Sequence, residues 1–256
     1  MRSENLAHAR IGAIGKNNFG STMKVIEYQG HSDILVKFDK GKPVHTSWQA
    51  FCKGNVRYVY DLTVYGVGYI GEGEYMPSLN RKDTPQYKTW SSMIKRCYSK
   101  RFIETNPAYL NCSVTAEWHN FQNFAKWYDD NYYEINGETI CLDKDILKKG
   151  NKEYSPDTCV FVPESINKLF IKNEAKRGYL PVGVYLRSDG RKHPYQIIIG
   201  KGKNRINGKY KTLDEAFQAY KIHKEALIKK TANEYKNKIP LNLYEAMLNY
   251  NVEIND

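Results

Sequence analysis

Residues 140–170 carry the pattern that most restricts the fold of this chain. The apolar run Ile140-Cys141-Leu142 ends in Asp143-Lys144-Asp145, and a second β-type segment follows a loop and covers residues 154–163. A helical pattern begins directly afterwards, where Pro163 suits the first turn of a helix. The order predicts a strand, a loop, a strand and a helix within about 30 residues.

The end of the first predicted strand carries candidate metal ligands. Asp143 and Asp145 stand at i and i+2, so their carboxylates point the same way. With the amide oxygen of Asn167 on the following helix, they could hold a hard divalent cation such as Mg²⁺ or Mn²⁺. A metal held there would stabilise charge on a phosphate and lower the pKa of a bound water. The alternative is a strand end with ordinary surface charge.

The first third of the chain has the pattern of β structure. Residues 23–28 and 33–38 are β-branched and aromatic runs, and a returning strand is expected at 43–48. The glycine-rich segment 66–73 lacks the Lys-Ser/Thr ending of a phosphate-binding loop. We therefore interpret it as a linker that follows a small, bent β module.

The middle third begins with two aromatic segments at helical spacing. One contains Tyr87, Trp90, Ile94 and Tyr98, and the other runs from Trp118 to Tyr128. Aromatic stripes of this kind could stack on bases, but they more often form a core. We favour the core.

The last third repeats the change from strands to a helix. Residues 182–186 and 195–199 flank a Ser188-Asp189-Gly190 turn, which predicts a hairpin, and a third strand is expected at 205–210. Thr212 and Glu215 have the spacing of a capping box at a helix start. The whole pattern predicts an α+β fold in three parts. They are a small β module at 1–75, a ββα domain with preceding helices at 76–175, and a three-stranded sheet with helices at 176–256.

The basic charge is concentrated in one region. The formal net charge is +11, and residues 171–256 contribute +8 of it, against +2 from 1–80 and +1 from 81–170. Such an excess favours an acidic partner. Because arginines on strands can reach base edges and lysines neutralise phosphates, we expect double-stranded DNA. The candidate DNA contacts are Arg187, Arg191, Lys192, Tyr195, Lys201, Lys203, Arg205, Lys209 and Lys211.

Other features bear on the class of protein. No apolar run approaches the ~20 residues of a membrane-spanning helix, so no membrane partner is expected. The five cysteines include no CxxC pair, and the N-terminus lacks a signal-peptide pattern. We expect a cytoplasmic chain with reduced thiols and no structural zinc site.

The segment from Asp143 to Asn167 resembles the ββα-metal motif of HNH endonucleases, particularly the phage-encoded homing type. The surrounding frame, which includes Trp90, Arg96-Cys97-Tyr98 and Glu117-Trp118, is also similar. The resemblance implies that Asp143 and Asn167 bind the metal. If the chain is phage-encoded, it would act in the cytoplasm of the infected bacterial cell.

Two positions depart from the HNH pattern. Lys144 stands where the resemblance implies a histidine base, and Thr158 stands where it implies an asparagine that orients this base. A lysine base needs a strongly lowered pKa, whereas the flanking aspartates favour the ammonium form. Either another group serves, such as His119 or a metal-activated water, or the nuclease is inactive.

The basic last third resembles APETALA2-type DNA-binding domains, which place a three-stranded sheet in the major groove with a helix behind it. Gly183-Val184-Tyr185, the Tyr195 strand and the helix start at 213–217 carry this likeness.

Two functions follow as hypotheses. One is a divalent-metal-dependent homing endonuclease that hydrolyses phosphodiester bonds, and the other is a catalytically inactive, sequence-specific DNA-binding regulator. RNA binding is a weaker third, since no RNP-type pattern is present.

Overall fold

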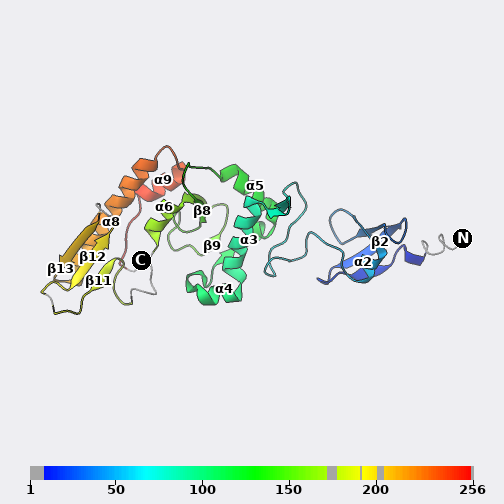
Figure 1. The fold of residues 1–256 in the computed structure, drawn as a ribbon, viewed down its shortest axis with the longest axis horizontal. Helices are drawn as coiled ribbons and strands as arrows, with labels where there is room; N and C mark the ends of the chain where they lie inside the picture. The colour runs from blue at the N-terminus through cyan, green and yellow to red at the C-terminus, as the bar shows by residue number, and fades with distance from the viewer. Residues whose placement is uncertain (1–8, 172–177, 191, 201–204, 255–256) are drawn as a thin grey trace. The chain divides into compact units, whose positions relative to one another are not determined.

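The computed structural model describes residues 9–171, 178–190, 192–200 and 205–254 (Figure 1). Helices and several small sheets both contribute, which confirms the α+β class. The chain forms two compact units: one contains the residues up to 130 together with 152–155, and the other contains 131–151 and the residues from 156 onward. The division at 1–75, 76–175 and 176–256 stays a prediction beside this grouping.

A four-stranded antiparallel sheet opens the first unit, in the order β1-β2-β3-β4. Val25 pairs with Val36, and both side chains are fully buried in a core with Met23, Ile34 and Phe51. The strands expected at 23–28 and 33–38 are confirmed. The one expected at 43–48 is shorter, because Trp48 begins a helix, and neither this helix nor the first strand was foreseen. The elements are β1 (Ile14–Lys16), β2 (Thr22–Tyr28), β3 (Ile34–Lys37), β4 (Val44–Thr46) and α2 (Trp48–Cys52).

The glycine-rich segment packs against the helical part of the same unit. Tyr69 donates its backbone N–H to the carbonyl of His119 and accepts from the N–H of Phe121, both at 2.9 Å. A Cβ on Gly68 would lie 2.8 Å from the ring of Trp90, so this position requires glycine for close packing. A two-stranded hairpin follows, formed by β5 (Ser78–Leu79) and β6 (Lys82–Asp83).

Aromatic side chains form the core of the helical part. Trp90, Trp118, Phe121 and Phe124 are fully buried, and the indole N–H of Trp90 donates to the carbonyl of Trp118 at 2.7 Å. The predicted stripes are therefore core. The elements are α3 (Pro85–Tyr98), α4 (Lys100–Thr105), η1 (Pro107–Tyr109), β7 (Ser113–Val114), η2 (Ala116–His119) and α5 (Phe121–Asn131), with β9 (Glu153–Tyr154) parallel to β7.

The second unit begins with the predicted ββα order. Strand β8 pairs antiparallel with β10, so that Asp143 lies opposite Val160. The second segment, expected as one strand over 154–163, is interrupted, because its first residues pair with β7 instead. The elements are β8 (Ile140–Asp143), β10 (Val160–Pro163), α6 (Glu164–Asn167) and η3 (Lys168–Phe170).

The three-stranded sheet and its helix are also as predicted, with the order β11-β12-β13. The capping box is present, since the side chains of Thr212 and Glu215 each accept from the backbone N–H of the other. The elements are β11 (Val184–Leu186), β12 (Tyr195–Ile199), β13 (Ile206–Tyr210), α8 (Leu213–Tyr235) and α9 (Leu241–Leu248).

Helix α8 serves two cores. Its first half places Ala216, Phe217 and Tyr220 against the three-stranded sheet. Its second half places Ile228 and Ala232 in a core shared with α9 and the ββα segment. Figure 1 shows the long helix running from the sheet to α9. The ββα segment and the sheet therefore have a structural element in common. In the described part of the chain, no helix is both long and apolar enough to cross a membrane.

Candidate functional site

Asp143 closes the turn that ends strand β8. Its Oδ1 atom accepts the backbone N–H groups of Asp145 at 2.9 Å and of Ile146 at 2.8 Å. Burial and the negative charge of Asp145 raise the pKa of Asp143 to about 6, although the two N–H bonds and the Lys144 cation act in the opposite direction. One oxygen of this carboxylate is therefore occupied by hydrogen bonds that stabilise the loop.

Lys144 is held inside the same loop. Its side chain is 9% exposed, and its Nζ donates to the Asp145 carboxylate and to the carbonyl of Asn151, both at 3.0 Å. The side-chain amide of Asn151 returns a bond to the carbonyl of Lys144 at 2.8 Å. An ammonium that donates to a carboxylate and a carbonyl is a structural cation, and in this geometry it offers no lone pair to a substrate.

The other predicted ligand lies on the helix that follows the hairpin. Asn167 is the half-buried last residue of α6, which packs against both β8 and β10. Thr158 is half-buried just before β10. The structure therefore brings Asp143, Lys144 and Asp145 together in one turn and places α6 against the strand that carries them.

The donor set fits a divalent cation only in part. Among the described residues, no group of three or more His, Cys, Asp and Glu side chains could hold a metal ion. Asp145 already pairs with Lys144. The second carboxylate oxygen of Asp143 and the amide oxygen of Asn167 remain as candidates. Mg²⁺ often binds one or two protein oxygens and completes its shell with water and substrate phosphate.

His119, the candidate base, belongs to the first unit, whereas Asp143 belongs to the second. Its Nε2 lies 3.0 Å from the carbonyl oxygen of Val114 and 3.5 Å from the hydroxyl of Tyr98. The ring also makes an edge contact with Tyr98. A ring nitrogen that donates to a backbone carbonyl holds the local fold, which is a sufficient role for this side chain.

The outward face of the three-stranded sheet carries a row of polar side chains across its strands. Arg187 donates from Nη1 to the side-chain oxygen of Gln196 at 3.4 Å, and the amide of Gln196 donates to the side-chain oxygen of Asn207. Tyr185, Gln196 and Lys209 pair directly across the three strands. Guanidinium and amide groups thus lie side by side on this face, opposite the core that α8 covers.

The predicted DNA contacts fall into three groups. Tyr195 lies on the opposite face, pairs with Leu186 and Tyr210, and packs against the core. Arg191, Lys201 and Lys203 lie outside the described residues. The exposed candidates are Arg187, Lys192, Arg205, Lys209 and Lys211.

Three residues of the outward face were missed from the sequence: Tyr185, Gln196 and Asn207. A signal for Gln196 was present, since it is the one strongly polar residue in the strand Tyr195–Ile199 and alternates with core-facing Ile197. Strand alternation places its neighbours in sequence on the other face. The same rule would have assigned Tyr195 to the core.

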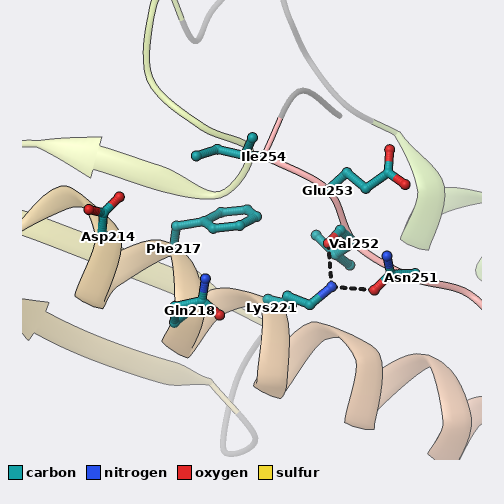
Figure 2. Close-up of a pocket in the computed structure, with 8 residues that line it drawn as sticks. All are labelled: Asp214, Phe217, Gln218, Lys221, Asn251, Val252, Glu253 and Ile254. Atoms are coloured by element: carbon teal, nitrogen blue, oxygen red, sulfur yellow. Dashed lines mark hydrogen bonds between the residues drawn. The ribbon is translucent and has the colours of Figure 1, made fainter.

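An open pocket of about 490 Å³ lies between the start of α8 and the C-terminal tail (Figure 2). Lys221 crosses one side of it, where its Nζ donates to the side chain of Asn251 and to the carbonyl of Val252. Glu225 accepts from Lys221 and from the N–H of Val252, both at 2.9 Å. Although burial acts to raise it, these bonds hold the pKa of Glu225 below its usual value. The polar groups around Lys221 and Glu225 thus fasten the tail to the helix.

Comparisons of this chain with protein-family models, with curated proteins and with solved structures find no match.

Proposed function

We propose that the protein binds double-stranded DNA through the outward face of the sheet β11-β12-β13. The observation that carries the proposal is the row Arg187–Gln196–Asn207 on the face opposite the core, in which the buried Gln196 bonds to the exposed Arg187 and Asn207 and so positions them. Exposed cations surround it, namely Lys192, Arg205, Lys209 and Lys211.

The chemistry of this row suits base edges. An arginine can donate two hydrogen bonds to guanine, and an asparagine can pair bidentately with adenine, which are the roles open to the exposed Arg187 and Asn207. The surrounding lysines suit phosphates, which fix the register of a protein on the duplex but carry no sequence information. Proteins that read DNA with β-ribbons or β-sheets place strands in a groove of the duplex, and we assign the same role to this face. The face therefore supports recognition of sequence as well as of charge.

The binding test compares two matched pairs of variants of the full chain. Duplexes selected from a random pool would be titrated by fluorescence anisotropy in EDTA. We expect Gln196→Ala to weaken binding to the selected duplex by ~1–3 kcal/mol relative to binding to random DNA. Lys209→Gln should weaken binding to both kinds of duplex and should reduce, by about one, the slope of log affinity against log salt concentration. The controls Gln218→Ala and Lys229→Gln change exposed residues of α8. Equal affinities for all five proteins would reject the proposal.

Metal-dependent phosphodiester hydrolysis is the second candidate function. It is supported by the position of Asp143, a partly buried carboxylate with a raised pKa on the strand against which α6 packs. A divalent cation held by Asp143 and Asn167 would stabilise phosphate charge and activate water. Lys144, tied to Asp145 and Asn151, supports the catalytically inactive regulator as the alternative.

Two measurements separate these alternatives. Under the nuclease hypothesis, Mg²⁺ or Mn²⁺ raises the melting temperature of the wild type but not of Asp143→Asn, because ligand binding stabilises only the state that binds. Plasmid nicking should disappear in the same variant. If neither measurement distinguishes Asp143→Asn from the wild type while DNA binding persists in EDTA, the inactive regulator is the correct alternative.

A further inference from the structure

The N-terminal β module is more basic than its sequence surroundings suggest. Residues 9–60 contain eight Lys and Arg against three Asp and Glu. Three of the seven acidic residues among the first 80, namely Asp61, Glu72 and Glu74, lie after residue 60. One of them, Asp61, is buried, where it accepts hydrogen bonds from Asn17 and Ser21. Residues 9–60 by themselves therefore have a net formal charge of +5, whereas the module as expected from the sequence, 1–75, has +2.

Strand register gathers part of this excess on one face of the sheet. Lys24 of β2 pairs directly with Lys37 of β3, and Ile14 of β1 completes the row. Lys16 pairs with Thr22 in the adjoining row on the same side. The three lysines are exposed, and this outer lysine face lies opposite the core side chains Met23, Val25 and Val36.

The direct pairing of Lys24 with Lys37 is unfavourable for an antiparallel sheet. Like charges directly opposite on an antiparallel pair are destabilising. Within the described residues, Lys16, Lys24 and Lys37 form neither a hydrogen bond nor an ion pair through their side chains. Two acidic side chains also lie on this face: Glu27, beyond the bulge in β2, and Asp33, whose Oδ1 lies 2.9 Å from Nδ1 of His45. The outer lysine face thus carries closely spaced ammonium groups whose charge an anionic partner would neutralise.

We propose that the outer lysine face is a second DNA-binding surface, which contacts the phosphate backbone. This inference rests on the proposed function, because the partner is the same DNA. Duplex DNA carries one charge per ~1.7 Å of its axis, so closely spaced lysines can each neutralise a phosphate and release its counterion. The outer lysine face lacks the guanidinium–amide row of the C-terminal sheet, so it contributes affinity without reading sequence.

The test removes the three lysines together in the full chain. We expect Lys16→Gln/Lys24→Gln/Lys37→Gln to weaken DNA binding on the order of tenfold and to lower the salt slope by about two to three, for selected and random duplexes alike. Circular dichroism and the melting temperature should stay unchanged or rise, since repulsion between Lys24 and Lys37 is relieved. The matched control, Lys88→Gln/Lys229→Gln/Lys230→Gln, removes the same charge from exposed helix positions.

Footprinting on a selected duplex distinguishes this inference from the proposed function. The N-terminal triple variant should lose protection in one part of the footprint, while Lys209→Gln and Gln196→Ala lose it in another. The inference is wrong if the sheet variants weaken binding but the N-terminal triple variant does not, or if the control triple variant weakens it equally. It is also wrong if the triple substitution affects only RNA or anionic lipid vesicles. A wild type that binds no DNA would overturn both proposals.

Discussion

Lys149 donates a hydrogen bond from Nζ to the backbone carbonyl of Asn251, 2.9 Å away, and so connects the loop after β8 to the C-terminal tail. The same ammonium lies 3.3 Å from the Glu253 carboxylate. From α8, Lys221 donates to the carbonyl of Val252 at 2.6 Å, and the Val252 side chain lies in the core beneath the sheet. The tail therefore links the loop that carries the candidate metal ligands to the helix that supports the candidate DNA-binding face.

This link predicts that Lys221→Met destabilises the protein by about 2 kcal/mol, since hydrogen bonds to charged groups are worth more than neutral ones. The change removes the partner of Glu225 and frees the tail at Val252. Urea unfolding would measure the loss. The matched control is Lys230→Met, which breaks an exposed pair with Glu234 at 3.9 Å and should cost less than ~0.5 kcal/mol. Equal losses in the two variants would contradict the link.

A second prediction concerns His119. If its role is to bind the carbonyl of Val114, His119→Ala should lower stability by about 1 kcal/mol, while His119→Gln, which keeps a donor, should lose less. Any nicking activity of the wild type should persist in both folded variants. The measurement combines thermal unfolding with plasmid nicking in Mg²⁺. Loss of nicking in a fully folded His119→Gln protein would instead identify His119 as the base.

Local patterns in the sequence predicted the elements well where the pattern itself determines the structure. The alternation at Ile34 and Val36 identified a buried strand face, and the Thr212–Glu215 spacing identified the start of α8. Both depend on neighbours a few residues apart. The same alternation rule, applied to β12, would have assigned Gln196 to the outward face and Tyr195 to the core.

Features that depend on distant partners were not predictable. Residues 153–154 pair with β7, about 40 positions earlier, and so interrupt the strand expected at 154–163. The Asp143 carboxylate accepts two backbone N–H groups because the turn folds over it, which residue types alone cannot show. The sharing of α8 between two cores likewise depends on contacts with the ββα segment and with the three-stranded sheet, whose residues are distant from the helix in sequence.

A third prediction compares two glycines with similar backbone angles. Gly183 has φ +74°, and a Cβ there would lie 1.9 Å from the ring of Tyr220 on α8. Gly183→Ala should therefore cost ~3 kcal/mol or more, because it adds a clash to backbone strain. Gly190 has φ +70° with no atom within 4 Å of the added Cβ, so Gly190→Ala should cost only about 1 kcal/mol. Denaturant unfolding of both variants measures the difference, and similar costs would show that Tyr220 does not pack on Gly183.

The last prediction follows from the raised pKa of Asp143, which burial and the charge of Asp145 bring to about 6. Because the unfolded carboxyl titrates near ~4, the folded state binds more protons between about pH 4 and pH 6, and the free energy of unfolding falls as the pH rises through this window. Asp143→Asn keeps an oxygen that can accept the N–H groups of Asp145 and Ile146 but does not titrate.

The variant should therefore be more stable than the wild type above pH 7, by about 3 kcal/mol for a pKa raised by roughly two units, and the difference should vanish toward pH 4. Urea unfolding of both proteins across this range, without divalent metal, provides the measurement. Asp145→Asn is the informative control. Loss of the Asp145 charge lowers the pKa of Asp143, because that charge raises it while the Lys144 cation, which remains, lowers it. The pH window over which stability falls should therefore be narrower in Asp145→Asn. A wild type whose stability rises between pH 4 and pH 6 as steeply as that of Asp143→Asn would show that Asp143 is not held in a partly buried, protonation-favouring turn.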